Sequence, residues 1–312
     1  MRALLIVLMS SMVLPALAAD NGILKLGDFE CVVGNNAAWG DTHKQKYNGV
    51  FQISMPGLSD TPFVPFYAGL NLEHYFDTRP RPEKSEVFFE PRHAPMSFLQ
   101  LSDTKAELHQ PKTPHYGVES WTTFSLTASG VIDMAYRCTP HKADAFEGDA
   151  LCVFWASYMN APINKSIYFL KAGSTLDAPQ WYQYGTQTHG SNSSVFSESD
   201  TLELNFHQGE GNLYASPAEV RYAAPFYYGR FRDHVIIFMY KTDHVLRMTQ
   251  SPSGGGSTPN EQDTNPAWDF QLLVPDYKVG EEYALDVRMV IQPWTGRDDV
   301  IKAYRNFVAA KR

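Results

Sequence analysis

The sequence predicts an all-β fold, a large antiparallel β-sandwich with one C-terminal α-helix. Short apolar runs recur along the chain, separated by Gly, Pro, Asn and Asp, which is typical of strands joined by turns. The chain also contains 17 Tyr, 19 Phe and 6 Trp, residue types that favour strands. Helical spacing of apolar residues occurs only near the end of the chain. Together these observations indicate an antiparallel sandwich.

Individual runs differ in the burial that they predict. Residues 201–206, Thr-Leu-Glu-Leu-Asn-Phe, alternate in polarity, as expected for a strand with one buried face. Residues 235–240, Val-Ile-Ile-Phe-Met-Tyr, are continuously apolar and predict a central strand. The other clear runs span residues 49–53, 120–126, 131–136, 151–158, 165–170, 245–249, 268–274 and 283–291.

One helix is expected, over residues 298–310. Val300, Tyr304, Phe307 and Val308 follow the i, i+4, i+7, i+8 pattern of an amphipathic helix that packs on the sandwich. The Gly-rich segment 251–265 lies between two expected strands, so we interpret it as a long loop and not as a domain boundary. Residues 19–312 are therefore expected to form a single β-sandwich domain.

Residues 1–18 have the order of a secretory signal peptide. Arg2 is followed by an apolar stretch over residues 3–14, and Ala-Leu-Ala at 16–18 fits a cleavage site. A membrane anchor would need about 20 apolar residues, and no later stretch is expected to cross a bilayer. The sequence therefore predicts a periplasmic or extracellular protein without a membrane span.

Charge and cysteine content narrow the expected partners. Without Arg2 the chain carries 25 basic and 34 acidic residues, a net charge of −9, which disfavours nucleic acid as a partner. The three cysteines lack metal-ligand spacing; we favour a bridge between Cys138 and Cys152 and a buried thiol at Cys31. No cofactor is predicted, and binding of a divalent metal by scattered histidines stays an open alternative. The sequence does not indicate an oligomeric state.

The best candidate for a site is a loop that prolines make stiff. Pro111 and Pro114 restrict the backbone of the segment 108–124, which presents His115 and Tyr116 before an expected strand. A stiff loop positions reactive groups well, so this pair is predicted to transfer protons. The alternative is a surface loop whose histidines are ordinary polar residues.

Further polar clusters complete the candidate site. The alternative is a solvated turn for segment 39–49, a surface ion pair for 90–96, and a hairpin turn capped by Arg232 and Asp233 for 225–234. Segments 39–49, 66–75 and 90–96 combine histidines with other polar side chains, and segment 225–234 places two arginines among aromatic rings that could support a sugar. No phosphate-binding loop, nucleophile elbow or zinc-binding helix motif is present. The predicted catalytic residues are His115, Tyr116, His189 and Glu119, and the predicted substrate-binding residues are Arg230, Arg232, Tyr228, His43, Asn71, His74, Trp121 and Trp268.

Several strings spread along the chain form a familiar set: residues 47–50, 66–71, 108–111, 114–121, 154–158, 160–162, 226–229, 249–256 and 265–271. With these strings the chain resembles a family of secreted proteins of unknown function from environmental bacteria. The strand order and His-rich loops are also similar, more faintly, to the galactose-mutarotase-like supersandwich of aldose epimerases, polysaccharide lyases and parts of glycosidases. That resemblance implies a supersandwich-like fold and carries no catalytic residue across.

Two classes of function follow from these observations. The first is a carbohydrate-active enzyme, foremost a β-eliminating lyase in which an arginine neutralises the carboxylate of an acidic glycan. A sugar epimerase of similar fold, or a glycoside hydrolase, is the alternative within this class; a hydrolase needs two opposed carboxylates. The second class is a non-catalytic glycan-binding protein with an aromatic platform. The candidate carboxylates for hydrolysis are Glu73, Glu90, Glu119 and Asp269.

Overall fold

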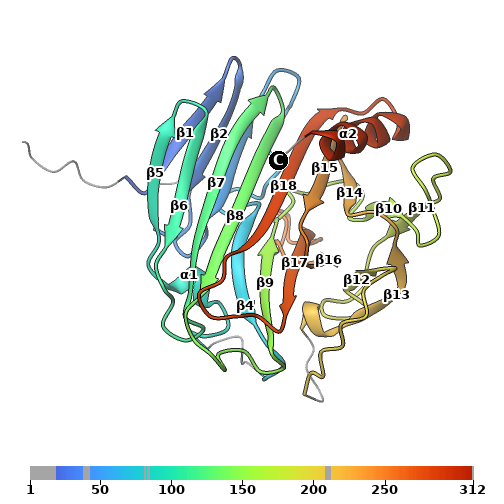
Figure 1. The fold of residues 1–312 in the computed structure, drawn as a ribbon. Helices are drawn as coiled ribbons and strands as arrows, with labels where there is room; N and C mark the ends of the chain where they lie inside the picture. The colour runs from blue at the N-terminus through green and yellow to red at the C-terminus, as the bar shows by residue number, and fades with distance from the viewer. Residues whose placement is uncertain (1–18, 38–42, 81, 83–84, 208–211, 311–312) are drawn as a thin grey trace, which may run out of the picture.

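The computed structural model describes residues 19–37, 43–80, 82, 85–207 and 212–310. The predicted signal peptide and residues 39–42 of one polar cluster lie outside these ranges. As predicted, the fold is nearly all β, with antiparallel sheets and one helix at the C-terminal end (Figure 1). In the described part of the chain, no helix is long and apolar enough to cross a membrane.

One layer of the sandwich is a nine-stranded sheet in which every neighbouring pair is antiparallel. In β7 (Val118–Ala128) and β8 (Val131–Pro140) buried and half-buried residues alternate, because only one face of these strands covers the core. The sheet continues from them to the two edges in the order β11 (Trp181–Tyr184), β10 (Ile167–Leu170), β14 (Phe226–Phe231), β15 (His234–Lys241), β18 (Tyr283–Pro293), β8, β7, β6 (Lys105–Gln110), β5 (Ser97–Ser102).

The facing layer is a six-stranded sheet, and a three-stranded sheet adds to the sandwich. Among the named strands of the described ranges, only β12 and β13 pair in parallel. The six strands follow the order β13 (Pro217–Tyr222), β12 (Ser194–Ser197), β16 (Val245–Ser251), β17 (Ala267–Pro275), β9 (Ala150–Ala156), β4 (Asn71–Phe76). The three-stranded sheet is β1 (Asn21–Leu26), β2 (Phe29–Gly34), β3 (Gly49–Ser54).

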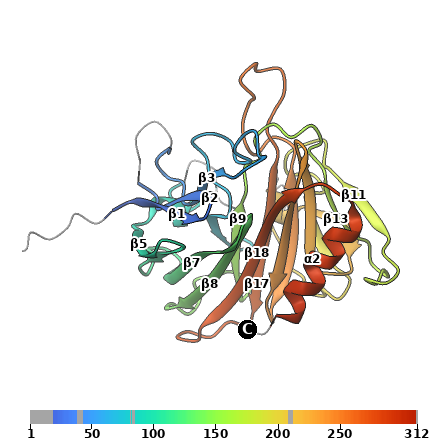
Figure 2. The ribbon, with the colours of Figure 1, turned by 90° about the horizontal axis from the view of Figure 1, so that it is seen from above.

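Buried side chains form three clusters separated by the sheets. The largest lies between the layers and includes Trp155, Phe238 and Trp268. A second cluster covers the outer face of the six-stranded sheet. A third lies on the outer face of the nine-stranded sheet, where α2 (Arg297–Ala309) packs (Figure 2). The short helix α1 (Glu90–His93) lies beside β4.

The expected strands are found, with one exception. Residues 201–206 form no ladder with another strand, so the prediction of a strand there is wrong. The alternation has another cause: Leu202, Leu204 and Phe206 are partly buried against the outer cluster on the six-stranded sheet. The predicted helix is confirmed and begins one residue earlier, at Arg297.

The favoured disulfide is absent, and all three cysteines are buried thiols. Cys138 belongs to the cluster between the sheets, whereas Cys152 belongs to the cluster on the outer face of the six-stranded sheet. The backbone of the six-stranded sheet therefore lies between the two side chains. A disulfide would require a different pairing register of the strand that contains Cys152.

A buried ion pair fastens the 198–206 segment to the six-stranded sheet. The Arg247 Nε donates to Asp200 Oδ2 over 2.8 Å, and its Nη2 donates to the Leu202 carbonyl over 2.6 Å. Both charged side chains are 1% exposed. The guanidinium also lies 3.6 Å from the centre of the Phe196 ring. Removal of one partner would leave the other charge buried without compensation.

We predict that Arg247→Met lowers the free energy of unfolding by about 3–5 kcal/mol, because the Asp200 carboxylate is left buried and unpaired. Urea unfolding measures this loss. Lys25→Met is the control, since its pair with Glu30 is exposed and its loss should change stability little. Equal stability of the two variants would contradict the prediction.

Candidate functional site

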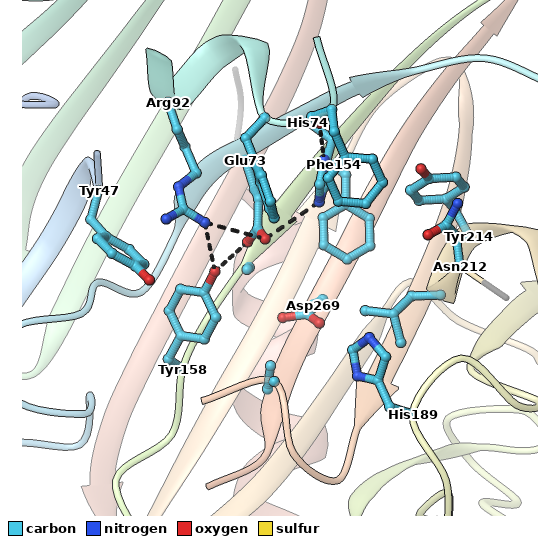
Figure 3. A pocket seen from close by; sticks show the side chains of 16 residues that line it. Tyr47, Glu73, His74, Arg92, Phe154, Tyr158, His189, Asn212, Tyr214 and Asp269 are labelled. Carbon is cyan, nitrogen blue, oxygen red and sulfur yellow. Dashed lines mark hydrogen bonds and ion pairs between the residues drawn. The ribbon is translucent and has the colours of Figure 1, made fainter. Parts of the chain in front are cut away.

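A pocket of about 710 Å³ opens on the outer face of the six-stranded sheet (Figure 3). Strands β4, β9 and β17 form its floor, and α1 and the loops around residues 189 and 212 form its walls. The lining residues are mostly aromatic or ionisable: Tyr47, Glu73, His74, Phe88, Phe89, Arg92, Phe154, Ala156, Tyr158, His189, Asn212, Leu213, Tyr214, Gly254, Ala267 and Asp269.

A bulge in β4 turns two consecutive side chains toward this pocket. Leu72 pairs with Trp155 and His74 pairs with Phe154, so Glu73 has no partner of its own in the ladder. On either side of the bulge, Leu72 and Tyr75 point into the core between the sheets. Strict alternation would place Glu73 and His74 on opposite faces; the extra residue places both on the outer face.

Glu73 is a buried carboxylate held by three neighbours. Its Oε2 accepts a hydrogen bond of 2.6 Å from the Tyr158 hydroxyl. Its Oε1 lies 3.3 Å from His74 Nε2 and 3.6 Å from Arg92 Nη1. Burial disfavours its charge, but His74, then Arg92 and Tyr158, outweigh burial and hold the pKa of Glu73 below its ordinary value.

Arg92 is fixed by packing as well as by charge. Its guanidinium lies over the rings of Tyr47, at 4.0 Å, and Phe89, at 4.6 Å. Its Nε donates to the Lys46 carbonyl over 2.5 Å, and its side chain is 11% exposed. Pro91 lies in the first turn of α1, the short helix from which Arg92 projects. The positive charge of Arg92 is therefore directed at Glu73 and Tyr158.

Asp269 places a second carboxyl group in the same pocket. It belongs to β17, is 1% exposed, and its Oδ1 accepts a 3.0 Å hydrogen bond from the Ser157 amide. Its Oδ2 is buried and has no hydrogen-bond partner within the described chain. Burial, and then the charge of Glu73, raise the pKa of Asp269 well above its ordinary value. The pocket thus holds two carboxyl groups whose pKa values are shifted in opposite directions.

The walls combine flat apolar rings with polar groups. Tyr214 stacks on Phe76 at 4.1 Å, and His74 stacks on Phe89 at 4.6 Å. His189, at the exposed rim, forms a 2.8 Å hydrogen bond through Nδ1 with the Ser251 hydroxyl. Aromatic faces beside a few convergent polar groups are typical of pockets for small polar ligands, including sugars.

No group of three or more His, Cys, Asp or Glu side chains has a geometry that could hold a metal ion, as far as residues in the described ranges are concerned.

The structure brings two of the residues predicted from sequence, His74 and His189, into this pocket. Asn71 is fully buried behind it, and its Nδ2 donates to Glu73 Oε2 over 3.4 Å. His43 is also buried, with Nε2 3.2 Å from the Tyr47 carbonyl. Glu73 and Asp269, which the sequence suggests as carboxylates for hydrolysis, meet here.

The proline-stiffened loop, segment 108–124, lies outside the pocket. Tyr116 is 0% exposed and stacks on Phe146 at 4.5 Å, because it fills the core between the sheets. His115 lies edge-on against it, at 4.8 Å. The amides of both residues donate to the Glu90 carboxylate, that of Tyr116 over 3.0 Å. Their catalytic role stays a prediction, and the pocket does not include them.

Glu119 and Trp121 lie together on β7, away from the pocket. Glu119 accepts hydrogen bonds from His109, at 2.9 Å, and His141, at 3.0 Å, and Trp121 stacks on His109 at 4.8 Å. These contacts form a polar group on the outer face of the nine-stranded sheet.

The residues predicted around the 225–234 segment also lie outside the pocket. Trp268 fills the core and donates to the Lys165 carbonyl over 2.9 Å. Arg232 sits in the β14–β15 turn with φ of 52°, and its Nη1 donates to the Ala161 carbonyl over 2.8 Å. Tyr228 is 2% exposed and Arg230 is half-buried, both on β14. Their substrate-binding role remains a prediction.

Sequence reasoning missed Tyr158 and did not assign Arg92 a role. Tyr158 falls in the expected strand 151–158, where a tyrosine is usually core. The only signal for Arg92 is its place in the polar cluster 90–96.

Comparison of the sequence with protein-family models and with curated proteins finds no match. Among solved structures, a putative aldose 1-epimerase from Escherichia coli K12 is 10% identical, covers 88% of this chain and 99% of its own, and has a TM-score of 0.49. An aldose epimerase homologue from C. elegans is 7% identical over 88% of this chain and 99% of its own, with a TM-score of 0.43. A heparan sulfate lyase from Pedobacter heparinus is 9% identical over 86% of this chain and 34% of its own, with a TM-score of 0.40. The likeness is as faint as the sequence suggests, and it concerns the fold alone.

We predict that Asp269→Asn becomes more stable relative to the wild type as pH rises. In the unfolded chain Asp269 ionises above about pH 3.9, whereas in the folded chain its raised pKa keeps it protonated. The wild type therefore loses folding free energy with rising pH, by at most about 1.4 kcal/mol per pH unit, until the folded pKa is reached. Asparagine does not titrate, and its amide oxygen still accepts from Ser157.

Urea unfolding at pH 4, 5.5 and 7 measures the difference between the two proteins. Asp28→Asn, in the exposed turn between β1 and β2, is the control and should show no such trend. A difference that stays constant with pH would mean that Asp269 is ionised in the folded protein.

Proposed function

We propose that this pocket is the active site of a carbohydrate-active enzyme that transfers protons at the anomeric centre of a neutral sugar. Glu73 is the base and Asp269 is the acid. One observation carries the proposal: two carboxyl groups share one aromatic-lined pocket, and their surroundings move their pKa values in opposite directions. The predicted signal peptide adds that the enzyme acts outside the cytoplasm.

The chemistry uses the two protonation states directly. The Glu73 carboxylate removes a proton from the anomeric hydroxyl or from an attacking water. The Asp269 carboxyl group gives its proton to the ring oxygen or to the glycosidic oxygen as the bond to the anomeric carbon breaks. If the proton goes to the ring oxygen, the ring opens, and its reclosure inverts the anomeric centre. If the proton goes to the glycosidic oxygen and water attacks, the glycosidic bond is hydrolysed.

The remaining lining residues position these groups. Arg92, His74 and Tyr158 hold the Glu73 carboxylate in one orientation and ionised. The rings of Phe89, Phe154 and Tyr214 offer apolar faces on which a sugar ring stacks.

β-elimination on an acidic glycan, the first choice from sequence, fits the pocket less well. Such a lyase needs a cation that neutralises the uronate carboxylate, and the Arg92 guanidinium already faces Glu73. Burial, and then the Glu73 charge, raise the pKa of Tyr158 well above its ordinary value, so its hydroxyl is a poor base. In this alternative His74 and His189 would carry the proton transfers. A third alternative is glycan binding without turnover.

An activity screen separates these alternatives. The mature protein is incubated with free aldoses, neutral polysaccharides and uronate-containing polysaccharides, and optical rotation, reducing ends and ultraviolet absorbance of unsaturated uronates are followed. Accelerated change of rotation supports epimerisation, and reducing ends alone support hydrolysis. Unsaturated products would replace our proposal with the lyase.

We predict that Glu73→Gln and Asp269→Asn each lower turnover by about 10²-fold or more, since each removes a general acid–base group. In the wild type, activity should rise as Glu73 loses its proton, below the ordinary range of a glutamate, and fall as Asp269 loses its own at higher pH. Measured pH–rate profiles should lack the acidic limb in Glu73→Gln.

Glu107→Gln is the matched control, because Glu107 lies on β6 and contacts only the Thr123 hydroxyl among the described hydrogen bonds. It should keep full activity. If His115→Ala loses activity with its fold intact while Glu73→Gln keeps it, the stiff loop and not the pocket carries the reaction.

A further inference from the structure

An aromatic shelf lies on the outer face of the nine-stranded sheet, next to the start of α2. We use this name for Tyr168, Trp181, Tyr228 and Trp294. Tyr228 is its centre: Tyr168 stacks on it at 4.9 Å, Trp294 stacks on it at 5.4 Å, and Trp181 meets it edge-on at 5.2 Å. Tyr228 itself is buried, whereas the three rings around it are partly exposed.

Two arginines border the shelf without a carboxylate partner. The Arg230 guanidinium lies 4.4 Å from the centre of the Trp294 ring, and no hydrogen bond or ion pair to it occurs within the described chain. Its Nε is buried and unsatisfied, which is uncommon for a side-chain donor. Arg297 is exposed, and its Nε donates to the Tyr228 hydroxyl over 3.0 Å. Both positive charges are therefore available to a ligand.

Most other arginines of the described chain have a carboxylate partner. Seven of them form ion pairs with aspartate or glutamate: Arg79, Arg92, Arg137, Arg232, Arg247, Arg288 and Arg305. Arg221 instead donates to the carbonyls of Ser197 and Asp200. Asp298 and Asp299, in the first turn of α2, form no ion pair with Arg230 or Arg297. The shelf thus brings together two arginines that form no ion pair, in a protein with a net charge of −8.

We propose that Arg230, Arg297 and the aromatic shelf form a second glycan-binding surface, for polysaccharides that carry carboxylate or sulfate groups. Guanidinium groups bind both kinds of oxyanion through paired hydrogen bonds, and tyrosine and tryptophan rings stack on sugar faces. The negative net charge disfavours unspecific attraction of polyanions, so binding of such a polymer depends on this local arrangement.

This surface is separate from the pocket. The shelf belongs to the side-chain cluster under α2, and the pocket belongs to the cluster outside the six-stranded sheet; both sheets lie between them. The surface can therefore hold an acidic polymer whatever reaction the pocket performs, and the proposal does not rest on the proposed function.

Affinity electrophoresis tests the surface with the mature protein. Native gels contain polygalacturonate, dextran sulfate or neutral dextran, and quenching of tryptophan fluorescence gives dissociation constants for the same polymers. We expect retardation by at least one acidic polymer and none by dextran. Retardation by polygalacturonate alone identifies carboxylate as the recognised group, and retardation by dextran sulfate alone identifies sulfate.

Arg230→Gln and Arg297→Gln should each weaken this binding about tenfold or more, because each removes charge-assisted hydrogen bonds. Arg305→Gln is the matched control: it lies on the same helix, changes the net charge equally, and loses a guanidinium that already pairs with Asp177. It should bind within about twofold of the wild type. Glu73→Gln should also bind like the wild type.

Several outcomes would overturn the proposal. They are the absence of binding to both acidic polymers, equal weakening by Arg305→Gln and Arg297→Gln, and tighter binding of oligothymidylate, which would indicate a nucleic-acid surface. Circular dichroism of each variant checks the fold. If the half-buried Arg230→Gln does not fold, the exposed Arg297→Gln decides the result.

Discussion

The ionised carboxylate of Glu73 is the constraint around which the pocket is built. A charge buried on the outer face of a sheet is costly unless donors and opposite charges surround it. Three side chains surround the Glu73 carboxylate: His74 from the bulge in β4, Arg92 from α1, and Tyr158 from the segment that follows β9. Three separate parts of the chain therefore converge on one side chain, and α1 lies beside β4.

Asp269 shows the consequence of that constraint. Once Glu73 is ionised, a second negative charge in the same buried space is disfavoured, and the unpartnered Oδ2 of Asp269 finds no donor that would offset it. A fold selected for stability alone would place an apolar residue or an amide at this position of β17. A carboxyl group whose pKa is raised by burial and by a neighbouring charge disfavours the folded state as pH rises, and such groups cluster at functional sites.

The fold follows from short-range patterns more readily than the site does. Periodicity of two identifies β7, β8 and β18, and helical spacing identifies α2, because each pattern lies within a few consecutive residues. The same rule fails at residues 201–206, whose alternation reflects packing on a sheet and not membership of it. Backbone pairing depends on register with distant strands, and the sequence alone does not contain that register.

The site is harder to predict for the same reason. Glu73 and Asp269 are recognisable as candidate carboxylates, but their meeting depends on the pairing of β4 with β9 and of β9 with β17. The residue types at positions 71–76 do not indicate the bulge that turns Glu73 toward Asp269. Tyr116 illustrates the same limit, since its place on a proline-stiffened polar loop gives no sign that its side chain fills the core.

The arginines on the two faces of the sandwich differ in their partners. This difference gives the two faces different chemical properties. In the pocket, Arg92 is surrounded by Glu73, Tyr158 and aromatic rings, so it controls the protonation of a neighbour and has little charge left for a ligand. On the shelf, Arg230 and Arg297 rest on aromatic rings with no carboxylate, so their charge is directed outward. Under the two proposals, an arginine among aromatic rings controls a proton in the pocket and binds an anion on the shelf. What decides between these roles is whether an acidic side chain is packed beside the arginine.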